Sequence, residues 1–469
     1  MSLLKLDRND DSTLHEQIVD GISKLIYKKI LLHGAKLPSI RSFASDHAIS
    51  PYTVSGAFNK LVLTGFLESR PGAGFYAKLP KTYKKEEIKQ TKSDPIKQAF
   101  DYIWFVRGQL KDEPGKLNAS SGVSPNESLM DSRLISQSLK KLSTRKSSSL
   151  VKYGSAKGLN NLRQLIQLKL NDISIQSDLE QIILTQGATQ AFDFIIRYML
   201  KPGDSVLVDD PGYFNLFGNL KLHNIKAIGV PRTPSGPDIN ICAKLIKQYN
   251  PKLFFTQSVL HNPTGTSISP NCGFKLLNLA SEHGITIIEN DSYSDLATNN
   301  NTRLSTLDQL ENVIYVSTFS KSVSSALRVG YIACDRKLAR EFANIKVLSS
   351  ITSSAVDEQL VYNALTDPSY RSMLHKFIQG TENNIHSMIN QLESLNFDIF
   401  SKNAGGKFIW FKVPGVEDSV KISKLAAASN LIIAPGSVYR PDLTPTPWLR
   451  LNTAYHKHPE LIKFLHSLT

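Results

Sequence analysis

The chain has 469 residues, more than one ordinary hydrophobic core organises, so two or three domains are expected. Hydrophobic residues make up 41% of the sequence and charged residues 20%, which is ordinary for a soluble globular protein, and no apolar run is long enough to suggest a membrane-spanning helix. The 55 Lys and Arg residues outnumber the 41 Asp and Glu residues, and the net charge of +14 favours a polyanionic partner, of which nucleic acid is the usual one.

The N-terminal residues and the cysteines indicate a cytoplasmic protein. The N-terminal stretch contains acidic residues where a signal peptide would need apolar ones. Cys242, Cys272 and Cys334 are far apart and lack the spacing of metal ligands, so they are expected to be reduced thiols. We therefore expect no membrane segment and no metal site.

Residues 12–78 are predicted to form a compact unit of three helices and a β-hairpin. Apolar residues recur at helical spacing after Ser12 or Thr13, either of which can cap the first helix, and His33-Gly34 is expected to end it. Two further helical patterns and a segment that alternates around a Pro-Gly turn follow. They predict helices and a hairpin over residues 40–46, 51–64 and 66–76.

Residues 79–94 are predicted to be a solvated linker, because lysines and glutamates dominate there and large apolar residues are few. In residues 95–469, short β-rich runs alternate with helical patterns. These runs are too apolar for half-exposed strands, so they predict an α/β fold with a mainly parallel sheet that is covered on both faces. The expected strands are 181–184, 205–208, 253–256, 286–289, 313–318 and 330–334.

The front unit resembles the winged helix-turn-helix of GntR-type regulators in three ordered segments. These are Leu37-Pro38-Ser39-Ile40-Arg41, Ser50-Pro51-Tyr52-Thr53-Val54 and the wing from Gly65 to Gly74. The resemblance implies that the third helix enters the major groove of double-stranded DNA and that the wing tip approaches the minor groove. The residues expected to contact DNA are Arg41, Tyr52, Thr53, Ser55, Lys60 and Arg70.

The same unit departs from the GntR pattern at two positions. Pro51 and Gly56 stand where such domains often carry Arg, so the reading surface is less basic than usual. The alternative is a three-helix module that contacts proteins rather than DNA, but this alternative leaves the wing and the placement of the arginines unexplained.

A second cluster of residues indicates the chemistry of pyridoxal 5′-phosphate (PLP). Lys321 ends the segment Ser317-Thr318-Phe319-Ser320-Lys321, and Arg328 follows seven positions later. PLP needs a lysine that forms a Schiff base with its aldehyde, and its dianionic phosphate needs hydroxyls and an arginine fork. Lys321 is therefore the candidate Schiff-base lysine and catalytic residue, and Thr318, Ser320 and Arg328 are candidate phosphate ligands.

From about Asn118 to the C-terminus, the chain resembles a fold-type-I aminotransferase of class I and II, which has a large domain and a smaller α+β domain. Together with the front unit, the whole chain resembles the MocR-like subfamily of GntR regulators. The motifs that carry the resemblance are Tyr153-Gly154-Ser155-Ala156-Lys157-Gly158, Thr185-Gln186-Gly187-Ala188-Thr189, Asp210-Pro211-Gly212-Tyr213, Asn262-Pro263-Thr264-Gly265, Gly405-Gly406-Lys407-Phe408 and Trp448-Leu449-Arg450.

The resemblance implies a role in cofactor binding for four residues in these segments and for Tyr293. Ala188 and Thr189, at the start of a helix, would contact the cofactor phosphate through free backbone N–H groups. Tyr213 would stack on the pyridine ring. Asn262 would donate a hydrogen bond to the phenolic oxygen of the ring, which Tyr293 would also contact.

The segment Glu289-Asn290-Asp291-Ser292-Tyr293 leaves one position open. The family places an Asp here that keeps the pyridine nitrogen protonated, which makes the ring an electron sink. Counting back from Tyr293, either Asn290 or Asp291 can occupy this position. The ungapped register favours Asn290, with which transamination would be greatly slowed, whereas the chemistry favours Asp291, and we expect Asp291 on that ground.

These expectations favour a bacterial transcription regulator that a ligand controls. PLP held on Lys321 would be transferred to an amino acid or amine effector, whose carboxylate Arg450 would bind, and the change would reach the DNA-binding unit. The resemblance also implies a homodimer, because fold-type-I enzymes generally build each active site from two subunits. The alternatives are an active aminotransferase with an accessory DNA-binding head, a regulator that senses PLP itself, and a structural protein that binds neither DNA nor PLP.

Overall fold

The computed structural model describes residues 6–7, 12–27, 30–70, 73–78, 115–122, 132–143, 151–297 and 301–469. The chain divides into two compact units, Met1–Thr91 and Lys92–Thr469. We call the described residues of the first unit the head and those of the second unit the body. The predicted linker at residues 79–94 and the wing-tip residues Pro71 and Gly72 lie outside the described residues, so the predicted domain boundaries stay predictions.

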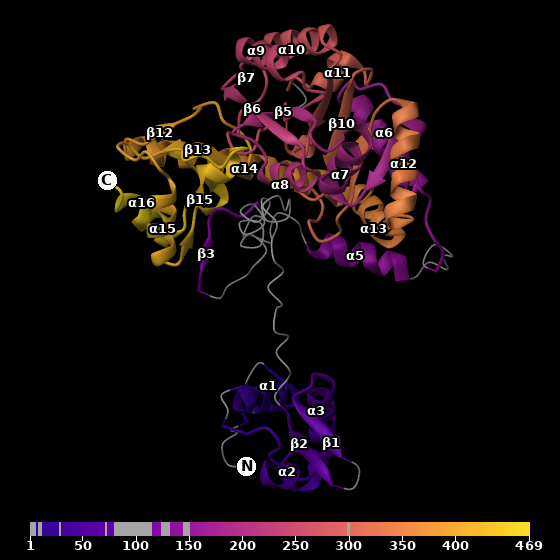
Figure 1. Cartoon of the computed structure of the whole chain (residues 1–469), viewed down its shortest axis with the longest axis vertical. Helices are drawn as coiled ribbons and strands as arrows, with labels where there is room; N and C mark the ends of the chain where they lie inside the picture. The colour runs from indigo at the N-terminus through magenta and orange to yellow at the C-terminus, as the bar shows by residue number, and fades with distance from the viewer. Residues whose placement is uncertain are drawn as a thin grey trace. The chain divides into compact units, whose positions relative to one another are not determined.

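The head contains the three helices and the hairpin that the sequence predicts (Figure 1). Ser39 caps the second helix by accepting a hydrogen bond from Ser42 N at 3.1 Å, and Ser50 caps the third, with Pro51 in the first turn. Leu67 pairs with Ala77 at the open end of the hairpin. The elements are α1 (Leu14–Tyr27), α2 (Ile40–Asp46), α3 (Pro51–Leu63), β1 (Leu67–Arg70) and β2 (Gly74–Ala77).

The first helix ends at Tyr27, earlier than the predicted end at His33-Gly34. The reason is tertiary, because the chain after the helix pairs with the hairpin. Gly34 N donates to Ala77 O at 2.7 Å, and Leu37 N donates to Phe75 O at 2.8 Å. These hydrogen bonds hold residues 34–37 alongside β2, with Lys36 paired to Tyr76, and a continued helix could not make them.

The centre of the body is an eight-stranded sheet with the order β4-β11-β10-β9-β8-β5-β6-β7. Its central strands are parallel, and β11 and β7 run antiparallel to their neighbours. All six predicted strands are confirmed to within two residues, but β6 and β7 were not predicted, because Gly229 and Pro231 interrupt the β-rich pattern of β6. The strands are β4 (Ile182–Thr185), β5 (Ser205–Asp210), β6 (Lys226–Thr233), β7 (Gly236–Pro237), β8 (Leu253–Thr256), β9 (Thr286–Asn290), β10 (Val313–Thr318) and β11 (Gly330–Ala333).

Helices cover both faces of this sheet, as the α/β prediction requires. Neighbouring residues of one strand belong to different core clusters: Ile288 packs in the cluster that contains α7 and α8, whereas Ile287 packs in the cluster that contains α9 and α10. A third cluster joins the sheet to α6 and α13. The helices are α5 (Ser132–Ser143), α6 (Asn160–Asp172), α7 (Gly187–Met199), α8 (Phe214–Leu222), α9 (Ile239–Tyr249), α10 (Pro270–Glu282), α11 (Leu304–Asp308), α12 (Arg336–Ser350) and α13 (Ala355–Leu365), with short turns η3 (Leu179–Gln181) and η4 (Ser294–Leu296).

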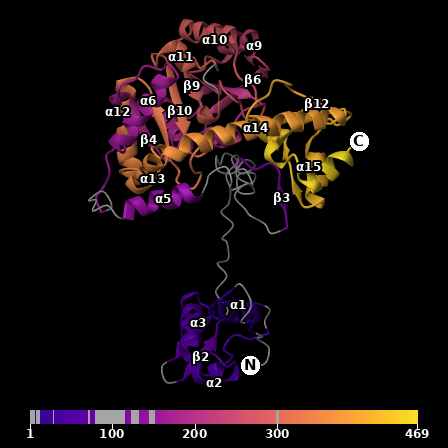
Figure 2. The ribbon, with the colours of Figure 1, turned by 180° about the vertical axis from the view of Figure 1, so that it is seen from behind.

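A smaller α+β lobe completes the body, as expected from the resemblance. The long helix α14 runs from the large sheet to this lobe (Figure 2). The lobe is built on a four-stranded antiparallel sheet with the order β12-β13-β16-β15. Its elements are α14 (Pro368–Ser394), β12 (Asp398–Ile399), β13 (Phe408–Lys412), α15 (Val420–Ala428), β14 (Leu431–Ile432), β15 (Ala434–Pro435), η5 (Gly436–Tyr439), β16 (Trp448–Asn452), η6 (Thr453–Tyr455) and α16 (Pro459–His466), and β14 pairs with β3 (Leu117–Asn118).

Two further findings concern membranes and cysteines. No helix in the described part of the chain is long and apolar enough to cross a bilayer. Cys242, Cys272 and Cys334 are buried, and none of them forms a disulfide.

Candidate cofactor site and nucleic-acid interface

Lys321 lies just beyond the carboxyl end of a central strand. β10 ends at Thr318, and the turn that follows carries Lys321. Burial, together with the positive charges of Arg328 and Arg450, lowers the pKa of the Lys321 ammonium group to about 8. Among the described residues, no hydrogen bond or ion pair engages Lys321 Nζ. A lysine that loses its proton this readily is suited to attack an aldehyde carbon.

A cradle for an anion lies next to Lys321. Helix α7 begins at Gly187, and no side chain caps its first turn, so backbone N–H groups of the segment that includes Ala188 and Thr189 are available to a ligand. Arg328 Nη1 donates to Ser320 Oγ at 3.0 Å, and Ser320 Oγ lies 3.0 Å from Thr318 Oγ1. A helix start, two hydroxyls and a guanidinium thus meet at one place, and this combination fits a phosphate.

Gly187 is required for this cradle. Its φ is +74°, and a Cβ atom at this position would lie only 2.6 Å from Arg328 Nη2. Arg328 itself has a φ of +51°, which is unusual for a residue with a side chain. The backbone therefore holds a strained conformation that brings the Arg328 guanidinium against the start of α7, and such strain is most often kept at functional sites.

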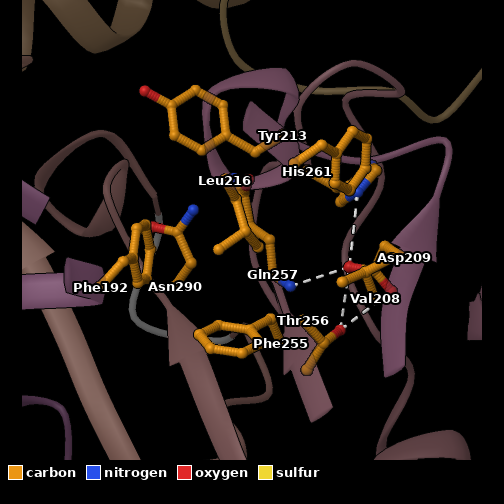
Figure 3. A pocket seen from close by; sticks show the side chains of 11 residues that line it. Phe192, Val208, Asp209, Tyr213, Leu216, Phe255, Thr256, Gln257, His261 and Asn290 are labelled. Atoms are coloured by element: carbon orange, nitrogen blue, oxygen red, sulfur yellow. Dashed lines mark hydrogen bonds and ion pairs between the residues drawn. The ribbon is translucent and has the colours of Figure 1, made fainter. Parts of the chain in front are cut away.

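A pocket with about 310 Å³ of empty space, part of it open to solvent, lies beside helix α7, whose Phe192 forms part of its lining (Figure 3). Tyr213, which follows β5, forms one wall of the pocket. The figure shows the Asn290 side chain across the pocket, with its amide nitrogen directed toward the space below Tyr213. The lining residues are Phe192, Val208, Asp209, Tyr213, Leu216, Phe217, Phe255, Thr256, Gln257, His261 and Asn290.

The structure corrects our expectation for the segment at the end of β9. Asn290, not Asp291, lines the pocket. Side chains alternate along a strand, so Asn290 lies on the same face as Ile288, and Asp291 lies on the opposite face. We expected Asp291 because the chemistry of the cofactor favours a carboxylate, but the direction of the backbone places the amide of Asn290 at the pocket.

Asp291 is instead part of a buried ion pair. Its side chain is fully buried, and its Oδ2 accepts hydrogen bonds from Arg303 Nε at 2.6 Å and from the Tyr315 hydroxyl at 2.9 Å. The acidic residue that does line the pocket, Asp209, is also occupied, because its Oδ2 accepts from Arg232 Nη1 at 3.0 Å and from Gln257 N at 2.9 Å. At the end of β9 the pocket is therefore lined by the Asn290 amide and not by the Asp291 carboxylate.

Two predicted ligand residues contact each other near Lys321. Arg450, on β16, donates from Nη1 to Asn262 Oδ1 at 2.8 Å, and this hydrogen bond leaves the Asn262 Nδ2 group able to donate elsewhere. Arg450 is buried, and its guanidinium carbon lies 3.9 Å from the centre of the Phe408 ring. Tyr293 packs edge-on against the same Phe408 ring. The predicted residues from both lobes are thus brought together around Lys321.

Sequence reasoning missed several residues of this site. Arg450 Nη2 also donates to Ser120 O, and a Cβ atom at Gly122 would lie 3.5 Å from Lys321 Nζ, so the segment after β3 approaches the lysine closely. Lys407 was quoted only as part of a motif, yet it is buried near Lys321. No periodicity in the sequence points to these residues, because they enter the site from loops and strand ends that are distant in the chain.

The head presents its predicted DNA-contacting residues on or near the helix-turn-helix and the wing. Tyr52 is 88% exposed at the start of α3, and Arg41 and Lys60 are also exposed. Thr53 and Ser55 are half-buried. These side chains give a surface of mixed polarity with few positive charges, as the sequence indicates.

Arg70 and Gly56 have specific partners within the head. Arg70 forms an ion pair with Glu68 at 3.2 Å, and its guanidinium lies 4.4 Å from the centre of the Tyr76 ring, so the arginine is held on the wing. A Cβ atom at Gly56 would lie 3.3 Å from the His15 ring of α1. The small residue at position 56 thus allows α3 to pack closely against α1.

Comparisons with known proteins agree on both units. Residues 115–468 match the family "Aminotransferase class I and II", and residues 14–77 match "Bacterial regulatory proteins, gntR family". The chain is 25% identical to an uncharacterized HTH-type transcriptional regulator, YdcR, of Escherichia coli, over 94% of this chain and 95% of that protein. It is 23% identical to the HTH-type transcriptional regulator NorG of Staphylococcus aureus, over 86% of this chain and 92% of that protein.

Solved structures show the same fold for the body. A kynurenine aminotransferase from Pyrococcus horikoshii superposes with a TM-score of 0.71 at 22% identity, over 82% of this chain and 95% of that one. The α-aminoadipate aminotransferase LysN from Thermus thermophilus superposes with a TM-score of 0.70 at 21% identity, over 79% of this chain and 97% of that one. At this level of identity, the likeness establishes the architecture of the body.

Proposed function

Because the chain belongs to the aminotransferase class I and II family and also carries a gntR-type head, we propose that it is a DNA-binding transcription regulator whose body binds PLP and responds to an amino acid or amine. The MocR-like architecture expected from the motifs is confirmed by these two matches. The observation that carries the proposal is the presence of both units in one chain, together with full-length relatives that are named as transcriptional regulators.

The residues of the body fit PLP. The phosphate of PLP would be held by Ser320, Arg328 and the start of α7, which includes Ala188 and Thr189. Thr318 donates a hydrogen bond to Ser320 Oγ and so orients this hydroxyl. Tyr213 would stack on its ring, with Asn262 and Tyr293 near the phenolic oxygen. When bound, PLP supplies an aldehyde that primary amines capture reversibly, and Lys321, with its lowered pKa, would be the amine of this chain that does so. Arg450 would bind the carboxylate of the effector through its guanidinium.

Asn290 supports regulation over turnover. A carboxylate facing the pyridine nitrogen keeps this nitrogen protonated, and the Asn290 amide lacks the negative charge to do so. The body would thus exchange amines on its cofactor while converting them slowly. An active aminotransferase with an accessory DNA-binding head is the second candidate function, supported by the otherwise complete set of cofactor-binding side chains.

Regulation requires that the effector bind differently to two states of the protein. We propose a homodimer in which effector binding changes the body and, through it, the presentation of the two heads. A two-fold dimer would then bind paired half-sites whose spacing follows the DNA helix. A cytoplasmic location accords with these partners.

The direct test is a gel-shift titration of the full chain on the DNA upstream of its own gene, with and without PLP and amino acids. We expect binding to this DNA and a change in affinity when PLP and one class of amino compound are both present. A change on adding PLP alone would instead identify the cofactor as the effector. Absence of any shift under every condition would overturn the regulator proposal.

PLP capture by Lys321 should depend on pH. Attack requires the deprotonated amine, and the pKa of Lys321 is lowered from 10.5 to about 8, so the initial rate of appearance of the cofactor absorbance band should rise with pH and reach half its maximum near pH 8. Stopped-flow mixing across a pH series measures this rate, and Lys321→Ala, which should retain no band after dialysis, is the control. A rate still rising steeply above about pH 9 would contradict the lowered pKa.

DNA binding should weaken uniformly when Lys60 is truncated. Lys60→Ala should lower affinity for operator and unrelated DNA alike and reduce the slope of log affinity against log salt by about 1, because a phosphate contact carries no sequence information. Fluorescence anisotropy over a salt series measures both effects. Lys24→Ala, at an exposed lysine of α1 outside the helix-turn-helix, is the matched control and should leave the slope unchanged. An unchanged slope for Lys60→Ala would remove Lys60 from the interface.

A further inference from the structure

A second lysine, Lys407, is buried beside Lys321. It precedes β13 in the smaller lobe, and only 7% of its surface is exposed. Its ammonium group lies 4.8 Å from the centre of the Phe377 ring. Burial, and then the positive charge of Lys321, lower the pKa of Lys407 to about 7. Lys321 reaches the neighbouring Phe408, because a Cβ atom at Gly122 would lie 3.5 Å from Lys321 Nζ and 3.9 Å from Phe408 Cζ.

The surroundings of Lys407 are mainly apolar. Phe377 belongs to a cluster with Tyr293, Leu296 and Phe408, against which Leu260 and Leu374 also pack. Within the described part of the chain, Lys407 Nζ has no hydrogen bond and no ion pair, and the Phe377 ring is the one group that interacts favourably with its charge. Burying a cation in this way is unfavourable unless an anion accompanies it.

Four cationic side chains influence one another around the site, and no acidic side chain is among the groups that shift the pKa of either lysine. Arg328 and Arg450 act on Lys321, and Lys321 acts on Lys407. Under the proposed function, Arg328 meets the cofactor phosphate, Lys321 meets the cofactor aldehyde, and Arg450 meets the effector carboxylate. Only Lys407 is then left without a partner.

We propose that Lys407 binds a second anionic group of the effector, so that the effector is an amino acid with an acidic side chain. The inference rests on the proposed function, in which Arg450 takes the α-carboxylate. Phe408 connects the surroundings of the two cations, because Arg450 packs on its ring and because it shares an apolar cluster with Phe377, whose ring Lys407 contacts. The apolar cluster would contact the methylene groups of such a side chain, and its carboxylate would meet Lys407.

A neutral amino acid would be disfavoured at this site. A bound neutral amino acid would exclude water from the Lys407 ammonium group without placing an anion beside it, and an unpaired buried charge is unfavourable. Discrimination by a buried polar partner is usually stronger than discrimination by shape alone. We therefore expect a preference for L-aspartate or L-glutamate over the amides of the same shape, L-asparagine and L-glutamine.

The experiment is a titration of the PLP-loaded full chain with these four amino acids, followed through the cofactor absorbance band. We expect one of the two acids to saturate the change at a concentration at least about tenfold lower than its amide. Lys407→Met, a neutral residue of similar length, should reduce this ratio to less than about threefold, and Lys407→Arg should preserve it. Because Met removes an unpaired buried charge, Lys407→Met should unfold at the same temperature as the native chain or higher.

The possible failures are distinguishable. Amides that saturate as readily as acids in the native chain would overturn the assignment of Lys407 and leave the proposed function intact. An acid preference that survives in Lys407→Met would also overturn it. A Lys407→Met variant that unfolds at a clearly lower temperature would do the same, since the contact of Lys407 with the Phe377 ring would then stabilise the fold. A native chain that retains no PLP, or whose band responds to no amino compound, would overturn the proposed function and this inference with it.

Discussion

Asn290→Asp is expected to increase the rate of conversion of an amino acid to its keto acid by about 100-fold, which corresponds to about 2.7 kcal/mol of transition-state stabilisation. The gain is expected because a carboxylate facing the pyridine nitrogen stabilises its protonated form. A hydrogen bond to a charged group contributes about 1.5–3 kcal/mol, which is the magnitude required. The substitution thus restores the group that the resembled enzymes place at this position.

The local geometry allows this exchange. Asn290 Oδ1 accepts hydrogen bonds from Ser292 Oγ at 2.6 Å and from Ser292 N at 3.2 Å. These hydrogen bonds orient the amide so that its nitrogen is directed toward the pocket (Figure 3). Nδ2 donates hydrogen bonds, and a donor at this point favours a ring nitrogen that carries no proton. An Asp would keep both contacts with Ser292 and place its second oxygen where Nδ2 now lies.

Single-turnover assays with PLP-loaded protein and detection of the keto acid measure the effect. Asn290→Ala is the control, because it removes the amide without adding a carboxylate and should give no gain. If Asn290→Asp turns over no faster than the native chain, residue 290 does not act on the ring nitrogen. The absorbance band of the loaded variant gives a second readout, since protonation of the ring changes it independently of turnover.

Asp291→Asn is expected to lower the free energy of unfolding of the body by about 3–5 kcal/mol, because it breaks one side of a buried ion pair. Asp291 and Arg303 are both buried, and the hydrogen bond of 2.6 Å between them is joined by that of the Tyr315 hydroxyl at 2.9 Å. With an amide at position 291, the Arg303 guanidinium would keep its charge and lose its counterion. Its other contact, from Nη1 to Asn301 O at 3.4 Å, is too long to compensate.

Urea denaturation followed by fluorescence measures this loss. The matched control is Asp204→Asn, which removes a carboxylate from the partly exposed pair with Lys252 at 2.7 Å and should cost no more than about 1 kcal/mol. A loss below about 1 kcal/mol for Asp291→Asn would mean that Asp291 is not held in the buried pair and could face the pocket. Together with Asn290→Asp, this variant tests the direction of both side chains at the end of β9.

The helices and strands were largely predictable because each depends on a local pattern. The starts of the second and third helices depend on local sequence, since the hydroxyls that cap them belong to Ser39 and Ser50, the residues just before each helix. The strands of the parallel sheet were recognisable as short apolar runs. The end of α1 was placed too late, because hydrogen bonds from Gly34 and Leu37 to the distant β2 decide it.

The residues of the large lobe that we propose to bind the cofactor could be named from the sequence for a related reason. Ala188, Thr189, Thr318, Ser320, Lys321 and Arg328 lie in two short segments at the ends of neighbouring elements, and their residue types match the needs of a phosphate and an aldehyde. Arg450 was also identified. No role was predicted for its neighbour Phe408 or for the nearby Lys407. The sequence around these two residues does not reveal which side chains of the large lobe lie against them.

The sequence by itself determined the two-unit plan and the α/β fold and pointed to Lys321 as the candidate lysine, since composition, periodicity and short motifs carry this information. Only the tertiary structure decided whether Asn290 or Asp291 faces the pocket. Both faces of a central parallel strand are buried, so apolar residues follow one another without alternation, and the pattern does not reveal which face a given side chain joins. The two faces differ only in the helices that pack on them, α7 and α8 on the face of Asn290 and α9 and α10 on the other.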